Sequence, residues 1–248
     1  MNSGPAAYFS DRAPQYARSR PTYPPRLADW LADAAPARGT VWEAGCGSGQ
    51  LTTLLGDRFG RVVATDISAE QLAHAPAHAR VHYVASSAEA APVRERAADL
   101  VVAAQAAHWF DLPRFFAEAR RVARPGALVA LVGYGNAVLD DDAFERRFVR
   151  FYDDEIGRFW PAQRRILLDG YASIDFPFDD VEPPALELAR DWTAGDMIAY
   201  VDTWSAVRVA RRAGADHAFA RFATELRELW GDRIRRVRWP LPVRAGRV

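Results

Sequence analysis

The sequence predicts an α/β fold built around a mostly parallel sheet, and three stretches carry that prediction. The first, Thr40–Gln50, is an apolar run that passes through three glycines at alternate positions before apolar residues recur at helical spacing. The second, Arg61–Asp66, is an apolar run closed by a carboxylate. The third, Asp99–Ala104, is apolar enough for a central parallel strand buried on both faces.

The elements can be placed in chain order from their periodicity and capping residues. Ser68 and Asp111 are suited to cap the helices that follow them, and Gly231 is suited to end one. Thr193 and Asp196 have the spacing of a capping box. In order, we expect a helix carrying Leu27 and Leu31, strand 40–44, a helix through Leu51 and Phe59, strand 61–66, a helix after Ser68, strands 80–84 and 99–104, helix 112–123, strand 127–132, helix 140–152, a sixth strand at 185–192, a helix from Thr193, helix 216–230 and a final strand across 236–244.

Length and composition indicate one enzyme-sized domain. The chain has 248 residues, of which 50% are hydrophobic, and its formal net charge is zero, so no overall field favours nucleic acid or an anionic membrane. All 32 basic residues are Arg, and the lone Cys46 excludes an internal disulfide and a Cys-rich zinc site, so we expect no metal. The amino terminus lacks a signal-peptide pattern and no apolar run reaches the roughly 20 residues of a membrane helix. We therefore expect a cytoplasmic protein.

The glycine loop and Asp66 together indicate a ligand that contains a nucleoside. Gly45, Gly47 and Gly49 let the backbone approach a ligand closely, and a carboxylate at the tip of the second strand can accept hydrogen bonds from both hydroxyls of a ribose. Nicotinamide dinucleotides and S-adenosylmethionine (SAM) both meet this description. A dinucleotide fingerprint has the spacing Gly-x-Gly-x-x-Gly, whereas this loop reads Gly-x-Gly-x-Gly and has an acid, Glu43, two residues before its first glycine.

That arrangement resembles motif I of the class I SAM-dependent methyltransferases, in which the acid helps to fix the methionine end of SAM. The Phe-Ser-x-x-Ala-x-x-Tyr-x-x-x-Arg-Pro arm at 9–21 and the run from His108 to Gly126 resemble the methyltransferase type 11 family, in particular relatives of trans-aconitate methyltransferases. The resemblance covers nearly the whole chain. It implies a Rossmann-like, seven-stranded, mostly parallel sheet with an antiparallel last strand, helices on both faces and a helical, aromatic lid.

The resemblance also implies the cofactor, SAM, with S-adenosylhomocysteine (SAH) as its product. It divides a single domain into an arm over SAM (1–25), a SAM-binding core (26–134) and an acceptor-side lid with the last two strands (135–248). An Arg fork in the arm is suited to the methionine carboxylate. The expected cofactor-binding residues are Tyr16, Arg20, Glu43, Gly45, Cys46, Gly47, Gly49, Asp66, Ile67, Ser87, Ala88 and Gln105.

His108 follows a central strand, where open α/β sheets bind their ligands. Its imidazole can act as a general base, orient SAM or the acceptor through hydrogen bonds, or cap the loop. We expect a catalytic role only for an acceptor that must lose a proton, because alignment alone supplies much of the rate of a methyl transfer. The residues expected to line the acceptor pocket are His108, Trp109, Tyr134, Trp160, Tyr171 and Trp204.

Three functions remain open at this point. The first is methyl transfer from SAM to a small-molecule acceptor by SN2 displacement. The second is methylation of a nucleic acid or a protein on the same core, which zero net charge and the absence of a separate basic module disfavour. The third is a SAM-binding regulator without catalysis. The sequence predicts neither the attacking atom of the acceptor nor an oligomeric state.

Overall fold

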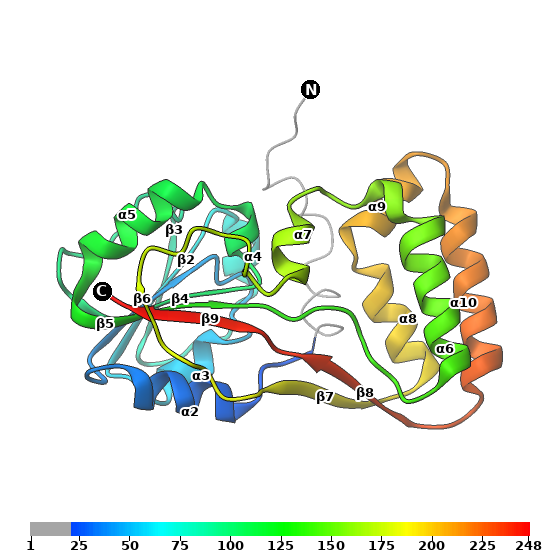
Figure 1. Cartoon of the computed structure of the whole chain (residues 1–248), viewed down its shortest axis with the longest axis horizontal. Helices are drawn as coiled ribbons and strands as arrows, with labels where there is room; N and C mark the ends of the chain where they lie inside the picture. The colour runs from blue at the N-terminus through cyan, green and yellow to red at the C-terminus, as the bar shows by residue number, and fades with distance from the viewer. Residues whose placement is uncertain (1–20) are drawn as a thin grey trace.

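The computed structural model describes residues 21–248, which form two lobes side by side (Figure 1). An α/β lobe contains the main sheet, and a helical lobe stands beyond the ends of several of its strands. The predicted arm residues Tyr16 and Arg20 lie outside the described residues. Among the described residues, no helix is long and apolar enough to cross a membrane.

The main sheet has seven strands, as the sequence predicted, and its last strand is antiparallel. The first five strands are parallel to one another, and β9 runs antiparallel between β5 and β6. Parallel strands end at one edge, so the loops after them meet there. The order is β3 (Val81–Ala85), β2 (Arg61–Asp66), β1 (Thr40–Ala44), β4 (Ala98–Ala104), β5 (Ala123–Val132), β9 (Val243–Arg247) and β6 (Asp179–Asp180).

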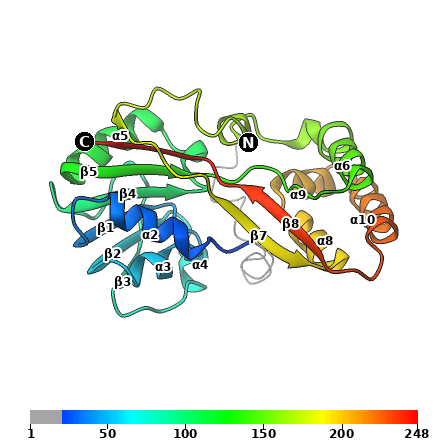
Figure 2. The same ribbon diagram turned by 60° about the horizontal axis from the view of Figure 1, so that its bottom comes forward.

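Helices cover both faces of this sheet (Figure 2). Alternate strand residues point to opposite faces, so Val41 packs with Leu27 of α2 while Trp42 packs 5.7 Å from the ring of Phe115 of α5. Both predicted caps are confirmed, because the side chains of Ser68 and Asp111 accept hydrogen bonds from the first turns of their helices. The flanking helices are α2 (Pro25–Ala34), α3 (Thr52–Gly56), α4 (Ala69–Ala73) and α5 (Leu112–Val122).

The helical lobe is assembled around aromatic side chains. The helix predicted at 140–152 begins after the N-cap Asp141 and continues as a π-helix, and the capping box of Thr193 and Asp196 is present as predicted. Trp204 lies at the centre of this lobe, with Phe148 and Tyr152 edge-on to it. The elements are α6 (Asp142–Val149), η3 (Arg150–Glu155), η4 (Gly157–Phe159), α7 (Arg164–Leu168), α8 (Ala194–Asp202), α9 (Ser205–Arg212) and α10 (Asp216–Trp230).

The predicted sixth strand and final strand need correction. The stretch at 185–192 does form a strand, β7 (Glu187–Trp192), but it pairs only with β8 (Arg235–Pro240) in a separate two-stranded sheet. The predicted final strand divides into β8 and β9, and the two-residue β6, at the edge of the main sheet beside β9, is the sixth strand of that sheet along the chain. Pro240 and Pro242 lack an N–H and cannot continue one ladder, so the chain changes partners between them.

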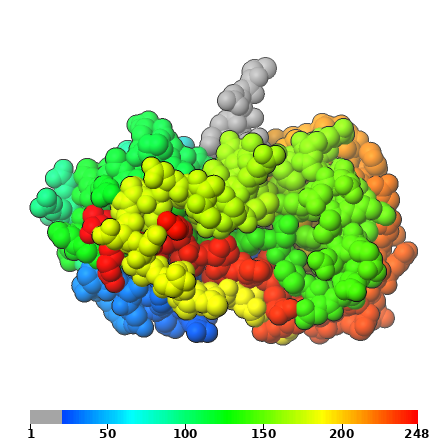
Figure 3. All heavy atoms as spheres, viewed as in Figure 1, coloured from blue at the N-terminus to red at the C-terminus, as the bar shows by residue number. Residues whose placement is uncertain are grey.

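The consecutive strands β8 and β9 link the two lobes. Figure 3 shows this carboxyl-terminal segment crossing the front of the molecule from the helical lobe to the α/β lobe. The crossing is tied on both sides: the N–H of Leu241 donates to the carbonyl of Leu186, and the N–H of Gly133 donates to the carbonyl of Pro242. The end of β5 and the last strand are thereby held together where the lobes meet.

Candidate active site

A cavity opens at the edge of the sheet where the parallel strands end. Its lining includes Glu43 at the end of β1, Asp66 at the end of β2, Ser86 after β3, Gln105 after β4 and Tyr134 after β5. This is the position at which open α/β sheets bind ligands, because the strand order reverses between β1 and β4. The cavity therefore gathers residues that are far apart in the sequence into one site.

The glycine loop folds as its spacing requires. Gly45, Gly47 and Gly49 all have positive φ, at 68°, 56° and 81°, a region that other residues rarely adopt. A Cβ on Gly45 would stand 2.5 Å from the Cβ of Ala106, so this glycine also lets the loop after β4 pack close. Gly45 and Gly47 line the cavity, whereas Gly49 packs against Tyr83 and does not.

Asp66 holds the glycine loop and still has acceptor capacity toward the cavity. One carboxylate oxygen accepts a hydrogen bond from the N–H of Gly47 and the other from the N–H of Ser68, each at 2.8 Å. A carboxylate offers about four lone-pair sites, more than its backbone hydrogen bonds use, so the group keeps acceptor capacity for a ligand. Such an acceptor suits the hydroxyls of a ribose. Burial raises the pKa of Asp66, and its backbone hydrogen bonds oppose that rise.

Glu43 is a buried acid whose Oε2 has no hydrogen-bond partner in the described part of the chain. Burial raises its pKa to about 8, the Thr52 hydroxyl opposes the rise, and the charge of Asp66 adds to it. The carboxyl group is therefore largely protonated at neutral pH in the ligand-free protein. A buried acid of this kind is poised for a cationic ligand, because a positive charge would restore its ionised form.

The charge of the lining distinguishes between the two ligands that the sequence left open. Three of the described lining residues, Glu43, Asp66 and Glu89, are acidic, and no Arg, Lys or His is among them. A dinucleotide would bring two phosphate charges to these acids. SAM brings a sulfonium and an ammonium group against one carboxylate, so its net charge is positive and opposite to that of the acids. The described lining fits SAM and opposes a pyrophosphate.

Gln105 connects the two strands that border the acceptor side of the cavity. It has φ of 56°, an uncommon backbone region for a residue other than glycine. Its N–H donates to the carbonyl of Val132 at 2.8 Å, and its side-chain amide donates to the carbonyl of Tyr134 at 2.9 Å. These two hydrogen bonds offset the backbone strain at Gln105. They also fix the end of β5 and the position of Tyr134.

The structure brings most of the predicted donor residues together. Gly49 is placed outside the cavity by its packing on Tyr83, and Cys46 is a buried lining residue whose pKa burial raises. Ile67 has 59% of its surface exposed at the cavity, which leaves an apolar side chain available to a ligand. The predicted donor residues that line the cavity are Glu43, Gly45, Cys46, Gly47, Asp66, Ile67, Ser87, Ala88 and Gln105.

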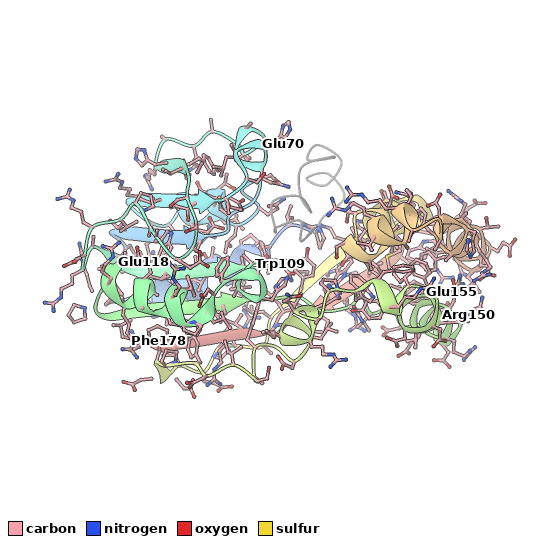
Figure 4. The ribbon with its side chains drawn as sticks, turned by 90° about the horizontal axis from the view of Figure 1, so that it is seen from above. Glu70, Trp109, Glu118, Arg150, Glu155 and Phe178 are labelled. Carbon is pink, nitrogen blue, oxygen red and sulfur yellow. The ribbon has the colours of Figure 1, made fainter. Side chains whose placement is uncertain are left out.

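The predicted acceptor residues separate into three groups. Trp109 and Tyr134 line the cavity, and Figure 4 shows Trp109 at the end of the α/β lobe that faces the helical lobe. Tyr171 and Trp204 do not line this cavity, because both are buried by packing, Tyr171 below the end of β5 and Trp204 inside the helical lobe. His108 and Trp160 are not among its lining residues either; the ring of His108 lies 5.1 Å from that of Trp109, which does line it, and Trp160 precedes α7 in the chain.

His108 is mostly buried, in the short helix η2 (Ala107–Trp109). Burial, with a smaller contribution from the charge of Arg164, lowers its pKa to about 3. Its imidazole is therefore neutral at pH 7 and a weak proton acceptor. Its Nδ1 has no hydrogen-bond partner among the described residues. The catalytic-base role stays a prediction, and the geometry favours a polar contact over proton abstraction.

Several lining residues were not predicted from the sequence. Gln50 and Leu51 follow the glycine loop directly, and Phe110 belongs to the His-Trp-Phe run, so the motifs themselves pointed to them. Tyr23 carries no such local signal. Its ring lies 6.3 Å from that of Tyr134, a contact that only the folded chain creates.

The comparisons with known proteins agree with this site. A family model described as a methyltransferase domain matches residues 42–131, which run from β1 to β5. A solved structure from Anaeromyxobacter dehalogenans, assigned as a type II methyltransferase, is 44% identical, with a TM-score of 0.84 over 92% of this chain and 97% of that one.

Two curated relatives are also assigned as methyltransferases. A Dictyostelium discoideum protein is 29% identical over 209 residues, 83% of this chain and 80% of its own. A Mycobacterium bovis protein is 40% identical over 125 residues, about half of each chain. The acidic cavity at the strand ends, the glycine loop and the seven-stranded sheet therefore have a common explanation. The chain belongs to the class I SAM-dependent methyltransferases.

Proposed function

We propose that this protein transfers a methyl group from SAM to a small-molecule acceptor by SN2 displacement. The observation that carries the donor half of this proposal is a cavity whose charged lining residues, in the described part of the chain, are all acids, at the edge where the glycine loop and Asp66 meet. When bound, SAM supplies a methyl group activated by its sulfonium. The protein then has to hold the donor, align the acceptor and exclude water, which together account for much of the catalysis.

Each donor residue has a distinct part in this proposal. Asp66 accepts from the ribose hydroxyls with the acceptor capacity that its backbone hydrogen bonds leave. Glu43 ionises against the cationic end of the ligand. Gly45 and Gly47 allow close approach of the backbone, and the exposed side chain of Ile67 covers one face of the adenine.

The composition of the helical lobe supports the proposal that the acceptor is a small molecule. The lobe has a dense aromatic interior, and several of its charged residues pair with one another, such as Arg147 and Arg150 with Glu225. Pockets for small molecules are mostly apolar, with a few polar groups that fix orientation. Three Arg residues of β8 and β9, Arg236, Arg238 and Arg244, pair with Asp191, Asp140 and Asp180, which reduces the positive charge that these strands offer to a nucleic acid.

Calorimetric titration with SAM, SAH and NAD in parallel tests the donor assignment. We expect binding of the first two and none of NAD. Asp66→Ala should weaken SAM binding by about tenfold to a hundredfold, because hydrogen bonds to a charged acceptor are lost. Glu70→Ala, which removes an exposed acid four residues away on α4, should leave the affinity unchanged. Thermal unfolding of both variants checks that they are folded.

The outcomes of these titrations separate the alternatives. NAD binding without SAM binding would overturn the donor assignment. Equal SAM affinity in wild-type protein and folded Asp66→Ala would remove Asp66 from the site. Transfer of a labelled methyl group from SAM to any small acceptor would exclude the regulator without catalysis, and transfer only to nucleic acid or protein would favour the second function that the sequence left open.

A further inference from the structure

A second group of side chains lies beside the donor cavity and has no part in donor binding. It consists of Asn136, Tyr152, Trp160 and Arg164, here called the Arg164 cluster, together with His108. These residues come from the segment after β5, from η3, from the segment after η4, from α7 and from η2. In Figure 1, α7 lies between the two lobes, and it packs against η2. The cluster therefore occupies the junction of the lobes.

Within residues 21–248, the groups that hold Arg164 in place are all neutral. Its guanidinium carbon lies 4.1 Å from the centroid of the Trp160 ring and 5.4 Å from that of Tyr152. Its Nε donates to the hydroxyl of Tyr152, and its Nη2 donates to Oδ1 of Asn136 at 3.2 Å. Trp160 is itself held by a bond from its Nε1 to the carbonyl of Tyr152 at 3.2 Å. The guanidinium is thus oriented before any ligand arrives.

The positive charge of Arg164 is not balanced within the described part of the chain. It has no carboxylate within ion-pair distance there, unlike Arg147 and Arg235, which are paired with Glu and Asp residues. A guanidinium has five N–H donors, and the two bonds above use two of them, so three remain. A half-buried cation with free donors and a fixed plane is suited to bind an anion.

His108 supplies a second, independent sign of a ligand. Its side chain is more than nine-tenths buried, and its Nδ1 has no hydrogen-bond partner among the described residues. Buried polar atoms are rarely left without a partner in the absence of a functional reason. Its neighbour Trp109 lines the donor cavity, as does Tyr134, two residues before Asn136. The cluster is therefore joined along the chain, at two points, to the wall of the donor cavity.

We propose that the Arg164 cluster binds a carboxylate of the methyl acceptor, with the guanidinium as the anchor and the rings of Trp160 and Tyr152 beside it. This inference rests on the proposed function, since it names the class of acceptor for the same site. Arg164 acts here as a binding residue. The anchored carboxylate is held by N–H donors and is distinct from the atom that attacks the methyl group.

The charge of the cluster selects a carboxylate over a phosphate. The cluster carries one positive charge, which a carboxylate neutralises, whereas a phosphate dianion would leave an excess negative charge in a half-buried place. The planar fork of an Arg also matches the two oxygens of a carboxylate. The charged residues that line the neighbouring donor cavity in the described part of the chain are acids, which also disfavours a second negative charge.

The test compares acids with amides of the same shape. The probes are benzoate and benzamide, cinnamate and cinnamamide, and crotonate and crotonamide, titrated at up to millimolar concentration into the full-length protein saturated with SAH. We expect at least one acid to bind measurably and its amide to bind about tenfold to a hundredfold more weakly. SAM affinity is measured on the same samples, so that failure of the donor assignment is recognised separately.

Three variants separate anchoring from a structural role. Arg164→Gln should reduce acid binding to the level of the amide. Asn136→Asp is the sharper variant, because its carboxylate would take the place of the Oδ1 that already accepts from Arg164 and would neutralise the guanidinium without removing it. The Asn136→Asp protein should still fold, and it should no longer bind the acids. Arg165→Gln changes the adjacent, exposed Arg of α7 and should bind the acids as the wild type does.

The result that would overturn the proposal is equally specific. If SAH binds and none of the acids does, or if acids and amides bind equally, the cluster is not a carboxylate site. The same holds if Asn136→Asp is folded and retains wild-type acid binding, because a neutralised guanidinium cannot then be the anchor. In each case intact SAM binding would leave the methyltransferase assignment standing.

Discussion

The protonation state of Glu43 that favours folding differs from the one that favours ligand binding. Burial favours the protonated carboxyl group, whereas a cationic ligand favours the ionised one. The side chain of Glu43 is 1% exposed at the end of β1, and burial raises its pKa from 4.5 to about 8. Between these two values the folded protein binds a proton that the unfolded chain has released. Folding is therefore most favourable at the acidic end of this window, and stability falls as the pH rises through it.

We expect Glu43→Gln to flatten this dependence and to stabilise the ligand-free protein at about pH 8. The gain can reach about 4 kcal/mol, since each tenfold change in proton affinity corresponds to about 1.4 kcal/mol. Urea unfolding at several pH values between 4.5 and about 8 measures this gain in stability. Glu70→Gln, at an exposed position of α4, is the control. Asp66, whose pKa is also raised, leaves a smaller slope of the same sign. A slope unchanged in Glu43→Gln would show that Glu43 is ionised in the free protein.

At this scale most of the residues gathered at the strand-end cavity were predictable, and the residues of an acceptor pocket were not. Glycine spacing and a terminal acid are local patterns, and the chain around Gly45 and Asp66 folds as they indicate. The same aromatic residue types line pockets and fill cores. The sequence therefore does not distinguish Trp204, which is buried in the helical lobe, from Trp109, which lines the cavity. Arg164 is one of 32 arginines, and only the tertiary structure reveals that its neighbours lack a carboxylate.

At the scale of elements, capping residues predicted boundaries well. Asp141 is a clear case, because its carboxylate accepts from the N–H groups of Ala143 and Phe144 at the start of α6 and also from Arg235, the first residue of β8. One acid thus begins a helix and ties it to a strand that is distant in sequence. The hydrogen bond from the N–H of Phe144 contributes most to lowering the pKa of Asp141, followed by the bond from the side chain of Arg235.

We expect Asp141→Ala to lower the free energy of unfolding by about 1–2 kcal/mol, the usual value of an N-cap. Asp142→Ala removes the neighbouring acid, which is not the cap, and should change stability by less than about 0.5 kcal/mol. Because the pKa of Asp141 is depressed, its contribution is present at neutral pH and is lost as the pH falls below the ordinary value of 3.8. Equal losses in both variants would contradict the assignment of Asp141 as the cap.

Strand partners were less predictable than strands themselves. Alternation identified residues 185–192 and 236–244 as extended, but a half-buried strand has the same pattern whatever strand it pairs with. The pairing of β7 with β8, and of β9 with β5, depends on contacts between residues far apart in the chain. The two-residue β6 is too short to show any periodicity.

The two lobes of the whole molecule share one apolar interior. A continuous cluster of buried side chains includes Leu27 and Val132 of the α/β lobe, Tyr134 at the junction, and Phe148 and Trp204 of the helical lobe. Lobes joined in this way are expected to unfold together, because separation would expose the shared part of the core. The chain therefore behaves as one cooperative unit despite its two-lobed outline.

This continuity can be measured through the distribution of tryptophans. Five of the eight, Trp160, Trp192, Trp204, Trp230 and Trp239, lie in the carboxyl-terminal half, so fluorescence reports mainly on that half. SAH, which is expected to bind the α/β lobe, should raise the thermal midpoint seen by fluorescence and by far-UV circular dichroism together, by roughly 5–10 °C near saturation. A fluorescence midpoint that stays fixed while the other rises would show that the lobes unfold independently.

The chain path between β5 and β9 has a consequence for how such enzymes diversify. These strands are neighbours in the sheet, yet residues 133–242 separate them, and that stretch contributes only the two-residue β6 to the sheet. It forms nearly all of the helical lobe, and three of the four residues of the Arg164 cluster lie beyond residue 150. If the proposed acceptor site is correct, a chain organised in this way can change its acceptor by replacing a single continuous insertion, without rearranging the strands that the family model matches at 42–131.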